Sequence, residues 1–385
     1  MTSAFLQRAR LLGTLVQTFL KDESGRLAEA VDRTVSEGLF CEADVRFALR
    51  HAQRSITPHT LESWMQNCIE GDAIATKIPL SSRSELRVLC LHAGNLPLVG
   101  LQDIIAVLLS GSRYYGKISR KDPHILSALL DELHASGAFG PLRYSTNLEE
   151  FDESAADLLI FSGSGRSVEH VMQRLKTGRM VHEKTSQLLR TAHTSAAYID
   201  PDALTHEDKK ALHEALFRYE GKGCRSLNTI FTPDAEKLLA HFKQAKEQEF
   251  RQNRYVHEHI FPKTPAPRIH YLKAFNEGIN RPYVQIGRFM IQVSEPQPDV
   301  EELITLTTLP ESKREEGLSS FIENCGTGFQ SLYAHQSSLS ESSERLPFEP
   351  LGDAQCPPVH WTPDGIDPLA WLIKQRKEQA HGRAG

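Results

Sequence analysis

The sequence predicts an α/β protein with two domains, the first of them built on a parallel sheet. From residue 85 onward, short apolar runs alternate with glycine-containing turns and longer amphipathic segments, which is the order strand, turn, helix. The run Asp157–Phe161 is almost wholly apolar, as is typical of a parallel strand covered on both faces. With 385 residues, the chain is also long enough for two hydrophobic cores.

Composition and charge describe an ordinary globular protein. The chain is 40% hydrophobic and 24% charged, with a net charge of −5, and no segment carries a dense stripe of Lys and Arg. We therefore expect no nucleic-acid partner. The N-terminal apolar residues are spaced as an amphipathic helix and are interrupted by Arg8 and Arg10, so we expect neither a signal peptide nor a membrane span. Six scattered cysteines without a C-x-x-C pair indicate thiols in a reducing cytoplasm.

The elements are expected in the following order. Helical patterns occupy Ala4–Leu20, Gly25–Glu37, Glu42–Gln53 and Thr57–Ile69. Strands are expected at Leu86–Leu91, Ser112–Ile118, Pro141–Tyr144 and Asp157–Phe161, with helices at Leu98–Leu109, His124–Ala135 and Val168–Leu175. A second α/β segment has strands at Ala196–Ile199, Thr229–Phe231, Tyr283–Ile286 and Phe289–Val293. The polar stretch 335–353 is interpreted as an irregular surface loop or linker. One domain should thus span 1–195 together with about 335–385, and the other 196–334.

Three turns should meet at the carboxyl edge of the first sheet, where ligands bind in such folds. In SGSGRS, Gly163 allows a tight turn, and the N–H groups of the following helix form a natural anion site; a turn without a ligand is about equally consistent with this pattern. In GKISRKDP, Lys117, Ser119 and Arg120 gather cations and a hydroxyl, although they could equally be solvated. In HAGN, the Asn95 amide could stabilise an oxyanion or simply its own turn.

Cys224 lies in the polar glycine turn EGKGCRSLN, where a packing role is hard to see. Lys222 and Arg225 are candidates for lowering its pKa, since a nearby cation favours a thiolate. No His or Asp stands at a motif spacing from it, so a Cys–His protease is not indicated, and a single cysteine is more often inert than catalytic. The histidines His257, His259 and His270 lack a carboxylate at a recognised spacing, so we expect no metal site.

The order HAGNLP, GKIS-x-x-DP, FSGS, GKGC resembles that of the aldehyde dehydrogenase superfamily, whose corresponding segments are P-W-N-F-P, K-P-S-E, F-T-G-S and G-Q-x-C. HAGN and the terminal WTPDGIDPLAWL are more closely similar to the LuxC-type acyl-CoA reductases, over about residues 85–372. The resemblance implies a Rossmann-type dinucleotide-binding domain preceded by helices, and a second α/β domain that carries the nucleophilic cysteine. It implies these roles: nucleophile Cys224, oxyanion donor Asn95, ribose contacts Lys117 and Ser119, and pyrophosphate turn Gly163 and Ser164.

The sequence departs from the dehydrogenase pattern at three points. An ungapped alignment places Arg190 where hydrolytic relatives carry a general-base Glu, and arginine cannot accept a proton from water. Arg120 replaces the glutamate of K-P-S-E; because an arginine can bind a 2′-phosphate that a carboxylate repels, the resemblance implies NADPH as the cofactor. The E-x-F-G-P segment that holds the nicotinamide ribose cannot be placed, and the region 280–286 lacks it.

The resemblance therefore implies reduction of a fatty acyl thioester, carried by CoA or by a protein, to the aldehyde through an S-acyl-cysteine. An acyl transferase or acyl-protein synthetase is an expected partner, and a homo-oligomer is expected. Two alternatives stay open: another enzyme of the superfamily, which oxidises an aldehyde or reduces an acyl phosphate or semialdehyde, and a non-catalytic nucleotide-binding partner of an acyl transferase.

Overall fold

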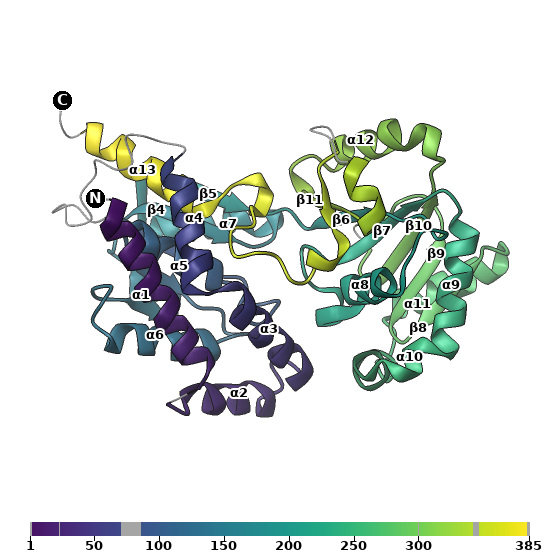
Figure 1. Cartoon of the computed structure of the whole chain (residues 1–385), viewed down its shortest axis with the longest axis horizontal. Coiled ribbons are helices and arrows are strands. Elements are labelled where there is room, and N and C mark those ends of the chain that lie inside the picture. The colour runs from purple at the N-terminus through teal and green to yellow at the C-terminus, as the bar shows by residue number, and fades with distance from the viewer. Residues whose placement is uncertain (1, 23, 71–85, 299, 342–345, 383–385) are drawn as a thin grey trace. The chain divides into compact units, whose positions relative to one another are not determined.

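The computed structural model describes residues 2–22, 24–70, 86–298, 300–341 and 346–382 (Figure 1). Its contacts divide the chain into two compact units, one formed by residues 1–191 and 357–385 and the other by residues 192–356. Each unit is an α/β structure around its own sheet, so the predicted fold class is confirmed. The dinucleotide-binding and catalytic roles of the two units stay predictions.

The first unit contains a five-stranded parallel sheet in the order β3-β2-β1-β4-β5. Its strands are β1 (Arg87–Leu91), β2 (Arg113–Lys117), β3 (Arg143–Ser145), β4 (Ala156–Ser162) and β5 (Val181–Arg190). The strand order reverses between β1 and β4, which is where doubly wound sheets bind their ligands. The first four strands lie where the apolar runs predict them. The fifth was not predicted, because the buried and exposed residues of β5 follow no regular alternation.

Helices pack around this sheet, and the first four of them precede β1 in the sequence. They are α1 (Thr2–Leu20), α2 (Arg26–Ser36), α3 (Glu42–Ser55), α4 (Pro58–Glu70), α5 (Leu101–Ser110), α6 (Ile125–Ala135) and α7 (Gly165–Thr177). The four N-terminal helices confirm the predicted helical segment. Within the described residues, no helix combines the length and apolarity needed to cross a bilayer.

The C-terminal helix α13 (Pro368–Gly382) returns to the first unit and packs on α5 and α4. The segment before it is fixed by side chains: Asp367 accepts a hydrogen bond from the Trp64 indole at 2.9 Å, and Gln102 donates to the carbonyl groups of Val359 and Trp361 at 2.8 and 2.7 Å. Asp364 accepts the backbone N–H of Thr191 at 2.9 Å. The segment WTPDGIDPLAWL is therefore a structural part of the first unit, held there by hydrogen bonds.

The second unit contains a seven-stranded sheet in the order β12-β11-β6-β7-β10-β9-β8. Its strands are β6 (Thr194–Tyr198), β7 (Leu227–Thr232), β8 (Tyr283–Ile286), β9 (Phe289–Val293), β10 (Leu303–Thr308), β11 (Phe329–Ala334) and β12 (Phe348–Pro350). Among the described strands of this sheet, β8 alone runs antiparallel to its neighbour, and the β8–β9 hairpin turns at Gly287, whose φ of +55° favours glycine. The four predicted strands are confirmed, whereas β10, β11 and β12 were not predicted.

The helices of the second unit include α8 (His206–Phe217), α9 (Ala235–Glu247), α10 (Glu249–Gln252), the π-helix η4 (Val256–Ile260), α11 (Pro267–Gly278) and α12 (Arg314–Cys325). Thr205 and Asp208 form a capping box that fixes the start of α8. Between α8 and β7 lies the short helix η3 (Arg218–Gly221), in which Tyr219, Glu220 and Gly221 all have positive φ. This left-handed stretch leads directly into the turn that contains Cys224.

The stretch 335–353, expected to be an irregular loop belonging with the first domain, is partly regular and belongs to the second unit. Residues 342–345 lie outside the described part of the chain. Beyond them, Leu346 and Phe348 are buried in the core, and β12 pairs with β11 in parallel. The apolar residues of LPF explain the difference, because their burial outweighs the polarity of the residues before them.

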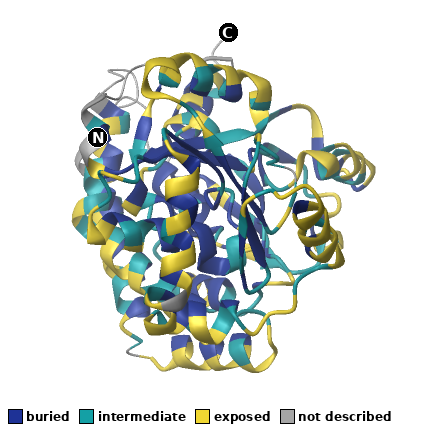
Figure 2. Ribbon diagram, turned by 90° about the vertical axis from the view of Figure 1, so that its right-hand side faces the viewer, coloured by how far each residue is buried: buried dark blue, intermediate teal, exposed yellow. Residues whose placement is uncertain are grey.

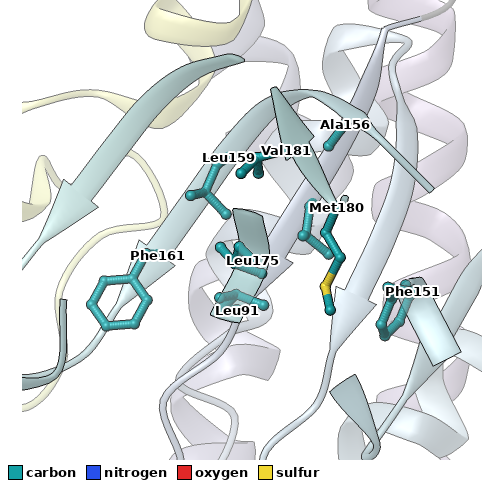
Figure 3. Packing of buried hydrophobic residues seen from close by; sticks show 9 residues of the cluster. Leu91, Phe151, Ala156, Leu159, Phe161, Leu175, Met180 and Val181 are labelled. Carbon is teal, nitrogen blue, oxygen red and sulfur yellow. The ribbon is translucent and has the colours of Figure 1, made fainter. Parts of the chain in front are cut away.

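Burial follows the sheets in both units. In Figure 2 the strands in the middle of the view are mostly dark blue, whereas the helices carry both buried and exposed residues. Figure 3 shows part of the core of the first unit, where side chains from the sheet meet Phe151, Leu175 and Met180. Leu91 and Phe161, the last apolar residues of β1 and β4, belong to this cluster, so the core reaches the carboxyl edge of the sheet.

Candidate active site

The turn after β1 contains the predicted oxyanion residue. Asn95 is exposed, whereas Gly94 is buried against the turn after β2. A Cβ placed on Gly94 would lie 2.0 Å from Ser119 Oγ and 2.5 Å from Ser119 Cβ. Only glycine allows this approach, since real Cβ contacts are never this short. The HAGN and GKIS turns are therefore neighbours at the sheet edge, as the parallel topology predicts.

The turn after β2 contains the two residues predicted to hold the adenosine ribose, Lys117 and Ser119, and Arg120, which is predicted to bind the 2′-phosphate. The Lys117 ammonium is half-buried, and its pKa is lowered by burial and then by the charge of Arg120. Ser119 Oγ accepts the N–H of Lys121 at 3.2 Å, while Arg120 is exposed. The structure thus presents an amine, a hydroxyl and a guanidinium in one turn.

Asp122 fastens this turn to the segment after HAGN. Its carboxylate accepts the Leu98 N–H at 2.8 Å, at a position where Leu98 has a φ of +62°. Burial raises the pKa of Asp122 to about 6. Asp122 thus holds the loop of the predicted oxyanion asparagine in place through a backbone contact.

The turn after β4 leads into α7. Gly163 N–H donates to the Arg190 carbonyl at 3.1 Å, and a Cβ on Gly163 would lie 2.5 Å from the Phe161 ring. Ser164 occupies the N-cap of α7, and residues 164–166 are exposed. The first N–H groups of a helix lack intrahelical partners, so this exposed end suits a phosphate.

A buried polar cluster lies behind these turns. Arg190 Nη1 lies 2.7 Å from Asp103 Oδ1, and the two side chains are only 8% and 4% exposed. The His92 Nδ1 lies 3.9 Å from Asp103 Oδ2, and its Nε2 is 2.7 Å from the Tyr114 hydroxyl. Burial lowers the pKa of His92 to about 4, so the ring is neutral at pH 7. Arg190, the residue at the aligned position of the general base, is therefore held in an ion pair inside the first unit.

Cys224 lies in a β-turn of the second unit that several hydrogen bonds hold in place. The Ser226 N–H donates to the Gly223 carbonyl at 3.0 Å, and the Gly223 N–H donates to Ser226 Oγ at 3.2 Å. The Cys224 carbonyl accepts a hydrogen bond from Ser195 Oγ at 2.9 Å. Gln355 Nε2 reaches Ser226 Oγ at 3.2 Å. The backbone on both sides of a partly exposed cysteine is thus fixed by side chains from β6 and from the end of the unit.

The two cations predicted beside Cys224 differ in their surroundings. The Lys222 ammonium lies 3.0 Å from Glu220, which also contacts Lys263 at 3.1 Å and Arg288 at 2.8 Å. Lys222 therefore shares one carboxylate with two other cations. Arg225 is 8% exposed; burial raises the pKa of both Tyr333 and Asp353, and the charge of Arg225 opposes that shift. Arg225 is consequently the buried cation of this turn.

The structure therefore brings the predicted cofactor residues and Asn95 to one edge of the first sheet, and places Cys224 in the second unit. Sequence reasoning missed the residues that support them, namely Asp103, Asp122, Ser195, Ser226 and Gln355. Asp103 had a signal, because it is a lone carboxylate in the apolar segment LQDIIAVLL, and carboxylates are seldom buried without a partner. The six cysteines, all within the described residues, form no disulfide.

The fold is that of the aldehyde dehydrogenases. The chain is similar to aldehyde dehydrogenase 21 from Physcomitrella patens, solved in complex with the reaction product succinate, with a TM-score of 0.60 and 12% identity over 96% of this chain and 84% of that one. A putative aldehyde dehydrogenase from Burkholderia cenocepacia gives a TM-score of 0.58 and 12% identity over 90% and 79%. At this identity the likeness shows the fold alone. No curated protein matches the sequence.

Residues 82–263 match the family model of acyl-CoA reductase (LuxC). This part of the chain is therefore similar to the LuxC-type acyl-CoA reductases, and the predicted resemblance is confirmed. The matched range begins before β1 and includes the HAGN, GKIS and FSGS turns as well as Cys224.

Proposed function

We propose that the protein reduces a fatty acyl thioester to the aldehyde with NADPH, through an S-acyl intermediate on Cys224. The observation that carries the proposal is the fastened, partly exposed Cys224 turn inside the range that matches the acyl-CoA reductase model. A thiol held by its backbone can be exposed without being mobile, and such preorganisation favours a nucleophile.

In the proposed reaction the Cys224 thiolate attacks the thioester carbonyl and the carrier thiolate leaves. Asn95 donates to the oxygen that becomes negative, together with the Cys224 N–H; a donor of this kind lowers a barrier by about 3 kcal/mol. Bound NADPH would supply the hydride that reduces this S-acyl group on Cys224. With a proton added at oxygen, the thiohemiacetal collapses to the aldehyde and regenerates the Cys224 thiol.

Hydrolysis is a competing fate for an acyl-enzyme, and Arg190 bears on it. In the proposal no general base stands at the aligned position, because the arginine there is cationic and paired with Asp103. Water attack on the S-acyl enzyme is therefore unassisted from this position. An enzyme that reduces its acyl intermediate with hydride benefits when water attacks that intermediate slowly.

The first unit fits a dinucleotide. Its strand order reverses between β1 and β4, and the exposed α7 N-terminus with Gly163 and Ser164 follows β4. Lys117 and Ser119 are proposed to bind the adenosine ribose. Arg120, exposed in the same turn, is proposed to bind the 2′-phosphate, since a guanidinium forms strong charge-assisted bonds with phosphate.

The test uses the purified chain with NADPH and three acyl donors: long-chain acyl-CoAs of graded length, the same acyl groups on a carrier protein, and a small acyl phosphate. The proposal predicts NADPH oxidation with an acyl thioester and formation of the aldehyde. Oxidation with the acyl phosphate alone would favour a semialdehyde reductase. Binding of NADPH without turnover, and without sensitivity to iodoacetamide, would favour a non-catalytic partner of an acyl transferase.

A further inference from the structure

Two histidines and a glutamate converge at one point of the second unit that the proposed reaction does not use. His213 lies near the end of α8, His241 in α9, and Glu249 at the start of α10. One potential ligand atom from each of them lies within 4.8 Å of the others. The three residues come from separate helices, so the fold, and not a local sequence motif, brings them together.

The Nε2 atom of each histidine in this cluster is buried. His213 is 5% exposed, and within the described part of the chain neither its Nε2 nor the Nε2 of His241 has a hydrogen-bond partner. Buried polar atoms are almost always satisfied, so two adjacent exceptions call for an explanation. A ligand that bonds to both nitrogens would supply one.

Packing holds the rings in place. The His213 and His241 rings are stacked, with centroids 6.0 Å apart and planes 18° from parallel. Phe250, the residue after Glu249, contacts the His213 ring at a centroid distance of 4.5 Å. The two imidazoles are thus oriented by an apolar wall, which is a favourable surrounding for metal ligands.

We propose that His213, His241 and Glu249 bind one divalent cation of the zinc class. Two imidazoles and a carboxylate form a donor set that zinc accepts, with a fourth position left for water. In a tetrahedral site with bonds of about 2.0–2.1 Å, ligand atoms lie roughly 3.3 Å apart. The three donors therefore need to close by up to about 1.5 Å. Glu249, partly exposed at the start of a four-residue helix, can shorten its own two distances by rotating, and the two imidazoles must close the rest by small changes of side-chain torsion.

The charges around the cluster are consistent with this proposal. Burial lowers the pKa of His213 to about 3, and neutral imidazole is the form that binds metals. Lys209, four residues before His213 on α8, opposes the positive charge, and its field acts on both histidines. Glu249 contributes the compensating negative charge.

A bound ion would join three helices. α8 and α9 both pack on β7, and α8 continues through η3 into the Cys224 turn. The ion would therefore act as a structural clamp beside the segment that leads to the cysteine. The inference does not depend on the reaction proposed above, because it concerns a separate set of residues.

The test is zinc binding to the full-length chain after EDTA treatment, with accessible thiols blocked by iodoacetamide so that cysteines do not contribute. Competition with a chromogenic chelator gives the affinity. We expect one zinc ion per chain, with binding weakened at least about tenfold by His241→Gln and by Glu249→Gln. These variants are preferred to changes at His213, which is deeply buried. The matched control is His206→Gln, an exposed histidine at the start of the same helix, which should leave binding unchanged.

A second arm uses Lys209→Gln. Removing this cation should tighten zinc binding severalfold, which a merely structural effect on α8 would not do. Circular dichroism checks that each variant is folded. Equal zinc binding by His241→Gln, Glu249→Gln and His206→Gln, or failure of the folded, thiol-blocked chain to bind zinc, would overturn the proposal and leave two neutral histidines packed in a core.

Discussion

Arg190 at the end of β5 and Asp103 in α5 form a buried ion pair with an Nη1–Oδ1 distance of 2.7 Å. The pair joins the edge strand of the first sheet to the helix that follows the HAGN turn. Removing one member should leave the other charge buried without its partner. We expect Asp103→Asn and Arg190→Met each to lower the free energy of unfolding by about 3–5 kcal/mol.

The double variant Asp103→Asn/Arg190→Met should cost much less than the sum of the single changes, since it leaves no unpaired charge. Urea unfolding of the four proteins measures this double-mutant cycle. Additive effects, or single changes that cost under about 1 kcal/mol, would show that the ion pair does not stabilise the unit.

Because Gly94 and Ser119 are in contact, we expect a change at Ser119 to restore the stability that a change at Gly94 removes. Gly94→Ala should lower the thermal midpoint, because the new methyl group meets Ser119 Oγ and Cβ. Adding Ser119→Gly removes both atoms and should recover much of the loss. Gly278→Ala is the control, since no atom within 4 Å meets a Cβ there. A double variant no more stable than Gly94→Ala would contradict this account of the two turns.

Asp122 predicts a pH dependence of stability. Its pKa of about 6 exceeds the value of about 3.9 expected in the unfolded chain, so between these limits the folded state holds the extra proton. Stability from this group is therefore greatest at low pH and is lost as the pH rises through about 4 to 6. The Leu98 N–H and His124 act in the opposite direction and are included in that pKa.

Asp122→Asn keeps the acceptor for Leu98 and removes the titration. Compared with the parent, it should gain about 2–3 kcal/mol between pH 4 and pH 8, measured by urea unfolding across that range. Asp32→Asn, the same change at an exposed position of α2, is the control. A stability difference that does not vary with pH would exclude the role of Asp122.

Arg120 predicts cofactor preference. Arg120→Glu should lower kcat/KM for NADPH by about 10- to 100-fold and improve NADH relative to it, because a carboxylate repels the 2′-phosphate. Steady-state rates with each cofactor measure the effect. The neighbouring change Lys121→Glu carries the same charge difference at an exposed position and should alter the preference much less. Equal effects of the two variants would mean that the cofactor preference depends on the total charge of the turn and not on a specific contact of Arg120.

The apolar strands of the first sheet were predictable because burial on both faces makes their sequences continuous, whereas β10, which is also apolar, was missed. β1, β2 and β4 are found within two residues of their predicted positions. β5 and β11 were not predicted, since their residues include Glu, Lys, Gln and Ser, and their strand conformation depends on neighbours far away in the chain. The mixed burial of β5 shows why periodicity alone did not indicate it.

The candidate site likewise has features that the sequence indicates and contacts that only the folded chain makes. The turns that contain Asn95, Lys117 and Gly163 could be predicted because glycines and polar residues follow apolar strands there, whereas Cys224 precedes β7; the roles of these residues stay predictions. The residues that hold them could not be predicted, because Arg190 pairs with Asp103 across 87 positions and Gln355 reaches Ser226 across 129. The cluster of His213, His241 and Glu249 likewise exists only in the folded chain.

The central claim is that Cys224 carries the acyl group. Mass spectrometry after mixing the chain with a long-chain acyl-CoA, in the absence of NADPH, tests it most directly. The account predicts a mass increase of one acyl group on the peptide containing Cys224, which disappears when NADPH is added. Cys224→Ala should show neither the adduct nor aldehyde formation. Acylation at another residue, or aldehyde production by Cys224→Ala, would contradict it.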